Sequence, residues 1–206
     1  MAYEHDIFVS YKRDPEALEW IRRFLKPLLT HRVQMELRRP VVVYVHEVGN
    51  QIPVGTAWPV ELGDVIARTR VLVALWSGDY LSSEWCRQEL SLMLQREQRN
   101  RARTARNKFG LVIPIVAHDG ETIPEKLAAA QKLEVFDYFN SRMPSDGVKA
   151  EKLADLIALH AKGIAAAINA APRWDKQWPR RAAQQFLNAF HVQQRTQRTL
   201  PRFNRR

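Results

Sequence analysis

Five short apolar runs, separated by segments with helical periodicity, constrain the fold of this 206-residue chain more than any other feature. The clearest run is RVLVALW at residues 70–76, whose apolar side chains are continuous instead of alternating with polar ones. Such a run, like the continuous β-branched run at 41–45, is typical of a strand buried on both faces of a parallel sheet. Strands are predicted at residues 6–11, 41–45, 70–76, 109–117 and 133–136. Pro114 in the fourth run indicates a bulge or a strand residue with no amide to pair.

The segments between these runs have the apolar spacing of amphipathic helices. We expect helices from Pro15 to near Thr30, at 60–67, from near Ser83, at 124–132 and at 148–171. Asp14 can cap the first of them, because Pro15 suits the first helical position. The regular alternation of strand and helix predicts a flavodoxin-like α/β fold, with a five-stranded parallel sheet and helices on both faces.

Three segments are predicted to converge on one pocket of such a sheet. Ligands bind where neighbouring strands diverge, at their carboxyl ends. The first and third predicted strands end at Ser10-Tyr11-Lys12 and Trp76-Ser77-Gly78. The loop at 46–58 is long and rich in Gly, Pro and Asn, so it can close over the same place.

The helix after the third strand carries an unusual pair of side chains. Trp85 and Glu89 are four residues apart and therefore share one helix face, with a carboxylate beside an indole. This pair could hold a flat aromatic ligand against a carboxylate. The alternative is structural, with Trp85 in the core and Glu89 either solvated or paired with Arg87 or Arg96.

Several classes of site are excluded or disfavoured by residue counts and spacing. The single cysteine, Cys86, excludes an internal disulfide and a cysteine-based metal site, and the six histidines lack metal-ligand spacing. We therefore expect no bound metal. The phosphate-binding patterns G-x-G-x-x-G and G-K-[ST] are absent, which leaves Lys12, Arg13 or loop amides as candidate phosphate contacts. No apolar run has the length of a membrane span and no signal-peptide pattern is present, so we expect a cytoplasmic protein.

The net charge of +10 is concentrated near the carboxyl terminus. From residue 172 onward there are nine Lys or Arg and a single acid, Asp175. We predict a domain at 1–171 and a basic, aromatic-containing extension at 172–206, with an amphipathic helix at 180–195. The extension either packs on the domain, docks a partner protein or makes weak contact with nucleic acid.

At this point the residues resemble the Toll/interleukin-1 receptor (TIR) domain family, and within it a bacterial NAD+-cleaving protein of the Thoeris-like antiphage type. Four signatures occur in the family's order: DIFVSY at 6–11, Gly55-Thr56-Ala57-Trp58, the strand at 70–77, and YLSSEWCRQEL at 80–90. The last contains the specific pattern Ser-x-Trp-Cys-x-x-Glu-Leu. The resemblance spans residues 3–171, but the loop at 46–55 is long and unusual, which leaves the family's usual oligomer contacts open.

The resemblance implies an enzyme that releases nicotinamide from NAD+. Enzymatic members place the catalytic glutamate four residues after the tryptophan of the last signature, which is Glu89 here. The same resemblance implies that NAD+ is the substrate, with no cofactor, and it suggests a set of substrate-binding residues. These are Phe8, Ser10, Tyr11, Lys12, Trp58, Asp64, Tyr80 and Trp85. A carboxylate near the ribose can stabilise the oxocarbenium-like sugar, and attack by water or by the substrate's own adenine decides between ADP-ribose and a cyclic isomer.

Two other functions remain open. A non-catalytic TIR adaptor would signal only through association with other TIR copies, and its signature would be the loss of the glutamate that is present here as Glu89. A nucleoside deoxyribosyltransferase-like enzyme shares the fold and a catalytic glutamate but would ignore NAD+. By analogy with enzymatic TIR domains, we expect other TIR copies as partners on activation, and a separate sensor or effector docked through the extension.

Overall fold

A computed structural model of the protein describes residues 3–47, 58–100, 109–122, 132–175 and 177–178. Three expected segments lie wholly or mostly outside these ranges, namely the loop at 46–58, the helix at 124–132 and the helix at 180–195. Within the described ranges, no helix combines the length and the apolar composition needed to cross a membrane.

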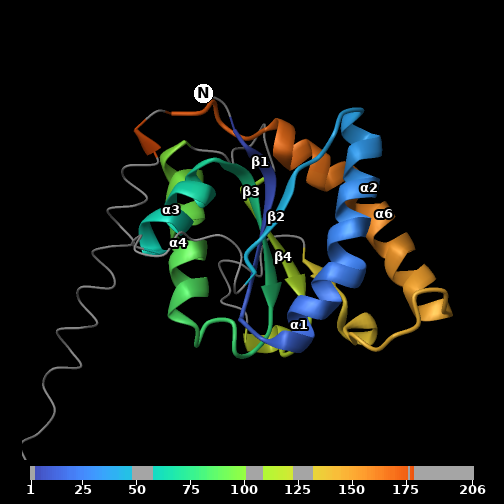
Figure 1. Ribbon diagram of the computed structural model, residues 1–206. Coiled ribbons are helices and arrows are strands. Elements are labelled where there is room, and N and C mark those ends of the chain that lie inside the picture. Colours follow the sequence, from blue (N-terminus) through green and yellow to red (C-terminus); the bar gives the residue numbers. More distant parts are fainter. Residues whose placement is uncertain (1–2, 48–57, 101–108, 123–131, 176, 179–206) are drawn as a thin grey trace, which may run out of the picture.

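A parallel sheet of five strands forms the centre of the fold, as the sequence predicts (Figure 1). The strands are β1 His5–Tyr11, β2 Val43–Val45, β3 Thr69–Trp76, β4 Val112–Val116 and β5 Leu133–Glu134. Their spatial order is β2-β1-β3-β4-β5, the order of the flavodoxin-like winding. Ser10 and Tyr11 of β1 lie beside Ala74 and Leu75 of β3. The carboxyl ends of these two central strands are therefore adjacent.

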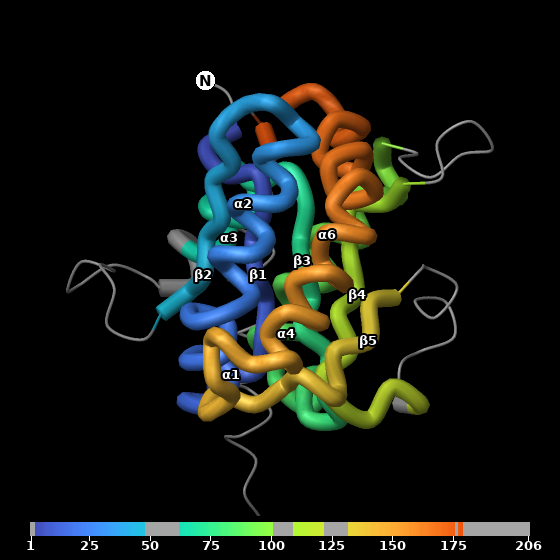
Figure 2. Tube along the Cα trace, turned by 90° about the vertical axis from the view of Figure 1, so that its right-hand side faces the viewer, coloured from blue at the N-terminus to red at the C-terminus, as the bar shows by residue number. Residues whose placement is uncertain are grey.

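Helices cover both faces of the sheet (Figures 1 and 2). One face carries α1 Pro15–Trp20, the π-helical turn η1 Ile21–Leu25, α2 Lys26–Leu37 and α6 Val148–Asn169. The opposite face carries α3 Trp58–Ala67 and α4 Glu84–Arg99. Two short 3-10 turns follow β4 and β5, namely η2 Gly120–Thr122 and η3 Phe136–Tyr138.

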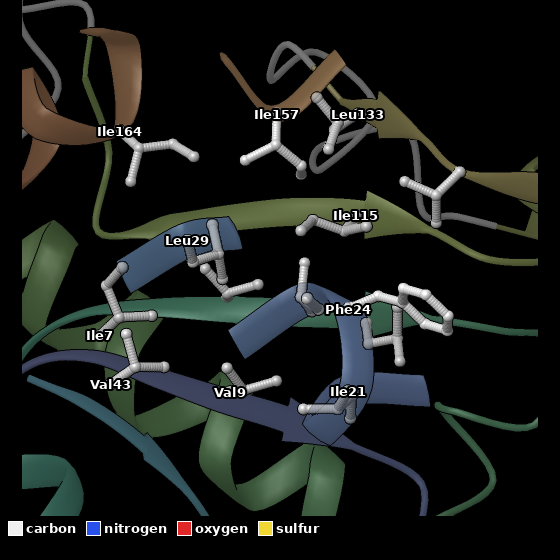
Figure 3. Packing of buried hydrophobic residues seen from close by; sticks show 14 of the residues in the cluster. Ile7, Val9, Ile21, Phe24, Leu29, Val43, Ile115, Leu133, Ile157 and Ile164 are labelled. Atoms are coloured by element: carbon white, nitrogen blue, oxygen red, sulfur yellow. The ribbon is translucent and has the colours of Figure 1, made fainter. Parts of the chain in front are cut away.

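Alternation along β1 divides the apolar side chains between two buried clusters. Ile7 and Val9 belong to the cluster under α1, α2 and α6, where Leu29, Ile157 and Ile164 also lie (Figure 3). Phe8 belongs to the cluster under α3 and α4. Each fully buried aliphatic side chain contributes roughly 1.5–3 kcal/mol, so the two clusters fix the helices on their faces.

The first helical segment is longer than expected. The predicted end near Thr30 is wrong, because α2 continues to Leu37. Leu29 and Val33 are both fully buried and four residues apart, so the apolar stripe continues past the predicted end. The helix stops where Arg38 takes a left-handed backbone conformation with φ of 54°.

Three strands are shorter than expected. The second run forms a strand only at Val43–Val45, and its position at the sheet edge leaves Tyr44 partly exposed, so the expectation of burial on both faces is wrong. The strand predicted at 109–117 is confined to Val112–Val116, and the one at 133–136 to Leu133–Glu134. Phe136 begins the turn η3 instead of extending β5.

Pro114 occupies a position where a missing amide costs little. The amide of Ala117 donates to the carbonyl of Trp76, and the carbonyl of Leu111 accepts from Leu72, so the odd-numbered residues of β4 bond to β3. Pro114 therefore faces the side of β5, whose register with β4 begins only at Ile115. The expectation of an unpaired amide position is consistent with this register.

An ion cluster fixes the amino-terminal end of β1. Arg39 donates to both carboxylate oxygens of Asp6 at 2.6 and 2.9 Å, Arg70 lies 3.3 Å away, and the amide of Val42 donates at 3.1 Å. Burial opposes the ionised form of Asp6, but these bonds and charges lower its pKa below the ordinary value. The first residue of the DIFVSY signature thus has a structural role.

The described part of the extension packs on the domain at this same end of the sheet. Trp178 is 5% exposed and belongs to the cluster under α3 and α4. The guanidinium of Arg96 lies between two aromatic rings, 4.9 Å from the ring centre of Tyr3 and 5.8 Å from that of Trp178. The hydroxyl of Tyr3 donates to the carbonyl of Pro172 at 2.6 Å. Pro172 and Trp178 therefore both contact the domain.

Candidate active site

The start of α4 places Glu89 against the carboxyl end of β1. Ser83 has an extended backbone and its hydroxyl accepts from the amide of Cys86 at 3.4 Å, which makes it the N-cap expected from the sequence. From this start, Glu89 falls on the buried face of the helix and is 5% exposed. Ser10 shares a strand face with Phe8, because residues two apart in a strand point the same way. Since Phe8 belongs to the cluster under α3 and α4, Ser10 and Phe8 both face α4.

A chain of hydrogen bonds connects three buried side chains at this point. The hydroxyl of Ser10 donates to Oε2 of Glu89 at 2.5 Å, and it lies 2.6 Å from the hydroxyl of Tyr80. Tyr80 is fully buried in the connection between β3 and α4, and its ring stacks on Trp76 with 4.9 Å between ring centres. Three elements of the fold thus meet at one carboxylate.

The environment of Glu89 keeps it close to half ionised at neutral pH. Burial raises the pKa of Glu89 to about 7, against the bond from Ser10 and the charge of Arg13, which both lower it. The guanidinium of Arg13 lies 5.3 Å from the ring centre of Trp85, one helical turn before Glu89. Burial and the charge of Glu89 raise the pKa of the Cys86 thiol to about 12, so this thiol is not a nucleophile at neutral pH.

The far side of the β1 end is held by Tyr11 and His46. The Tyr11 hydroxyl donates to the carbonyl of His46 at 2.8 Å, which fixes the chain just after β2. Burial lowers the pKa of His46 to about 4, assisted by the charge of Arg13, so this imidazole is neutral at pH 7. Burial likewise raises the pKa of Tyr11 to about 12.

A cavity of about 660 Å³ lies at the carboxyl ends of β1, β3 and β4. Its lining includes Lys12, Arg13, Ser77, His118 and Phe139, whereas Glu89 is not among its lining residues. Arg13 lines the cavity, and its charge also acts on the Glu89 carboxylate. A cavity is therefore present at the ends of β1 and β3, as the strand order predicts, but no residue of α4 lines it.

Gly78 has a structural reason to be glycine at the rim of this cavity. Its amide donates to Oδ2 of Asp119 at 3.3 Å, and a Cβ at this position would lie 2.6 Å from the same oxygen. Asp119 itself has a left-handed backbone with φ of 52°. The loops after β3 and β4 therefore approach each other closely at the rim.

The eight residues that the resemblance suggests for substrate binding occupy different environments. Ser10 contacts Glu89 directly, Tyr80 reaches it through Ser10, and Tyr11 and Lys12 line the cavity. Lys12 also pairs with Asp79 at 2.6 Å.

The other four of these residues belong to β1, α3 and α4. Phe8 is a core residue, 1% exposed, and Asp64 pairs with Arg68 along α3 at 2.8 Å. Trp85 is partly buried, packs against the cluster under α4 and lies beneath the guanidinium of Arg13. Trp58 is the first residue of α3, and its side chain lies outside the described part of the chain.

Two features of the site were not anticipated from the sequence. Arg13 was considered only for phosphate contacts, yet its charge acts on Glu89 and its guanidinium covers Trp85. The bond between Tyr80 and Ser10 joins residues seventy positions apart, which no local pattern can indicate. The available signal in the strand was the polar Ser10 directly after three apolar residues at 7–9.

Comparison with known proteins identifies the family. A model of the TIR domain family matches residues 7–157, more than half of the chain, whereas no curated protein matches. Among solved structures, the TIR domain of the Toll-related receptor TRR-2 from Hydra magnipapillata is 18% identical, covering 63% of this chain and 83% of that one, with a TM-score of 0.45. The TIR domains of the activated Roq1 resistosome, which directly recognises the effector XopQ, are 17% identical, covering 91% and 99%, with a TM-score of 0.39. On the family match, this chain belongs to the TIR domain family.

Proposed function

We propose that this TIR domain cleaves the bond between nicotinamide and ribose in NAD+, with Glu89 as the catalytic carboxylate. The observation that carries the proposal is a buried carboxylate that is bonded to Ser10 and acted on by the charge of Arg13, a residue that also lines the cavity at the carboxyl edge of the sheet. Glu89 also stands at the position of the catalytic glutamate in the signature that enzymatic members of the family share. The products would be nicotinamide and either ADP-ribose or an isomer of cyclic ADP-ribose.

The properties of Glu89 suit this reaction. Departure of nicotinamide leaves positive charge on the ribose, and a carboxylate in a water-poor site stabilises such charge more than one in water. With a pKa of about 7, a large fraction of Glu89 is ionised at neutral pH. Nicotinamide is cationic before the bond breaks, so its departure requires no general acid. One carboxylate is therefore sufficient, and the reaction needs no metal.

The cavity offers room for the rest of the dinucleotide. Lys12 and Arg13 line it and would attract the pyrophosphate, for which Lys12 would exchange its pairing with Asp79. Movement of Arg13 toward phosphate would uncover Trp85, which could then stack on a flat base. Phe8 would support the site from the core, and roles for Trp58 and Asp64 remain predictions.

The biological role belongs to the same proposal. Release of nicotinamide would either deplete NAD+ or make a cyclic signal for a separate effector, in antiphage defence in the bacterial cytoplasm. Activity would require association with other TIR copies. A sensor or effector protein would dock through the basic extension, which contains nine Lys or Arg and one acid.

A substrate panel separates this proposal from its alternatives. Purified protein at high concentration is incubated with NAD+ and, separately, with a 2′-deoxynucleoside and a second free base, and the products are identified by chromatography and mass spectrometry. We expect nicotinamide together with ADP-ribose, or with an isomer of cyclic ADP-ribose, which is lighter than ADP-ribose by one water. Base exchange on the deoxynucleoside with intact NAD+ would support the deoxyribosyltransferase reading. No turnover at any concentration, with or without a crowding agent that promotes assembly, would support the adaptor.

A further inference from the structure

Three buried oxygen-bearing side chains form a continuous hydrogen-bond chain that ends at Glu89. The Tyr80 hydroxyl lies 2.6 Å from the Ser10 hydroxyl, which lies 2.5 Å from Oε2 of Glu89. Tyr80 is fully buried, Ser10 is 1% exposed and Glu89 is 5% exposed. Bulk water therefore does not compete for these bonds, and each of them is stronger than its equivalent at the surface.

When Glu89 is ionised, the chemistry of the three groups fixes the direction of the hydrogen-bond chain. A serine hydroxyl has one proton, and Ser10 donates it to the Glu89 carboxylate. The bond between Ser10 and Tyr80 must then be donated by Tyr80. With Glu89 ionised, both hydroxyl protons have an acceptor. The arrangement therefore favours the carboxylate over the carboxylic acid.

The far end of the chain is held rigidly. The Tyr80 ring stacks on Trp76 of β3 at an interplanar angle of 26°, and the Tyr80 amide donates to the carbonyl of Ser77 at 2.8 Å. Ser10 is fixed by its place in β1, between β2 and β3. The donor that reaches Glu89 is thus preorganised before any substrate arrives.

We propose that Ser10 and Tyr80 are positioning residues that hold Glu89 as an oriented carboxylate, with Tyr80 acting only through Ser10. The inference rests on the proposed function, because it assigns these residues to the reaction of Glu89. Tyr80 is fully buried and so cannot contact substrate directly. The inference gives it a positioning role instead.

Other groups near Glu89 also affect its ionisation, in addition to the hydrogen-bond chain. Tyr11 and Arg13 face it from the end of β1 and the residues that follow, and Cys86 faces it from α4 itself. Arg13 favours the carboxylate, and burial opposes it. Since Tyr11 and Cys86 are neutral at pH 7, Arg13 and the hydroxyl chain are the groups here that stabilise the ionised form.

The direct test is a titration of the Glu89 carboxyl in the full chain. Carbon-13 at the glutamate δ position is followed by NMR as a function of pH, and the Glu89 signal is assigned by its loss in Glu89→Gln. We expect its pKa to rise by about one unit in Ser10→Ala and by a smaller amount in Tyr80→Phe. Tyr44→Phe is the matched control, because the Tyr44 hydroxyl lies on the same sheet face but is not part of the hydrogen-bond chain. It lies 3.4 Å from His46 Nδ1. An unchanged Glu89 pKa in Tyr80→Phe would overturn the inference.

The pH dependence of nicotinamide release gives a second readout. In Tyr80→Phe we expect the rate below about pH 7 to fall several-fold and to recover above about pH 8, where the carboxyl is ionised in both proteins. Ser10→Thr, which keeps the hydroxyl, should resemble the wild type more closely than Ser10→Ala. A uniform loss at every pH in Tyr80→Phe would indicate a merely structural role and contradict the inference.

Failure of the inference and failure of the proposed function are distinguishable. If the wild type releases no nicotinamide but the Glu89 titration moves in Tyr80→Phe, the hydroxyl chain is supported and the enzymatic proposal fails. If nicotinamide is released and the titration is the same in both proteins, the enzymatic proposal stands and the role of Tyr80 is refuted.

Discussion

As pH rises and Glu89 ionises, the wild type is expected to lose about 3 kcal/mol of its free energy of unfolding. The variant Glu89→Gln is expected to lack this pH-dependent loss. The pKa of Glu89 is about 7 in the folded chain, against an ordinary value of 4.5, and each pKa unit corresponds to about 1.4 kcal/mol. Because the folded-state pKa is the higher one, the stabilising contribution of this carboxyl is fully present below about pH 4.5 and is lost as pH rises through about 7.

The measurement is urea denaturation of the two proteins between about pH 5 and pH 8. The difference in unfolding free energy between Glu89→Gln and wild type should grow in favour of the variant as pH rises. A constant offset from the buried amide does not affect this slope, and other titrating groups such as His46 cancel in the difference. Glu84→Gln is the matched control on α4, because the pKa of Glu84 is lowered by its bonds to Arg87 and Gln88. Parallel pH profiles for wild type and Glu89→Gln would show that the carboxyl is not buried as described.

The second large effect is expected at the other end of α4, where Trp178→Ala should lower the free energy of unfolding by about 3–5 kcal/mol. The variant removes a nearly buried ring from the cluster under α3 and α4. It also uncovers one side of Arg96, a 3% exposed cation whose pKa burial lowers to about 10. Within the described residues, this guanidinium is held by the Tyr3 and Trp178 rings and by the carbonyl of Thr69 at 2.6 Å.

Trp174→Ala is the control for this prediction, because Trp174 lies in the same segment but outside both hydrophobic clusters. Its loss of stability should be clearly smaller, whereas truncation after residue 171 should cost at least as much as Trp178→Ala. Urea midpoints of the three variants decide the matter. Equal stability of wild type and Trp178→Ala would mean that Trp178 is not part of the packed domain.

The strand order and the start of α4 were predictable from the sequence because both depend on local patterns. The continuous apolar run at 70–76 indicates a central parallel strand, and a serine at 83 followed by the acid Glu84 indicates the helix start. The shortened edge strand at Val43–Val45 was not predictable, since an apolar run does not show how many neighbours a strand will have.

The site was only partly predictable for a similar reason. The pairing of Trp85 and Glu89 on one helix follows from their spacing, and the convergence of β1 and β3 follows from the winding. Burial of Glu89 and its bond to Ser10 depend on how α4 packs on the sheet, which spacing alone does not determine. The contacts of Arg96 with Tyr3 and Trp178 join three distant segments, so sequence reasoning offered Arg96 only as a partner for Glu89.

The central claim, that Glu89 is the carboxylate that cleaves NAD+, is tested most directly by one assay. Nicotinamide release from NAD+ is timed for wild type, Glu89→Gln and the control Glu84→Gln, at one pH near 8 and one high protein concentration. The account predicts turnover by wild type and Glu84→Gln, and a loss of about 10²–10³-fold or more in Glu89→Gln, because the developing charge on the ribose loses its counter-charge. Equal rates in wild type and Glu89→Gln would contradict it.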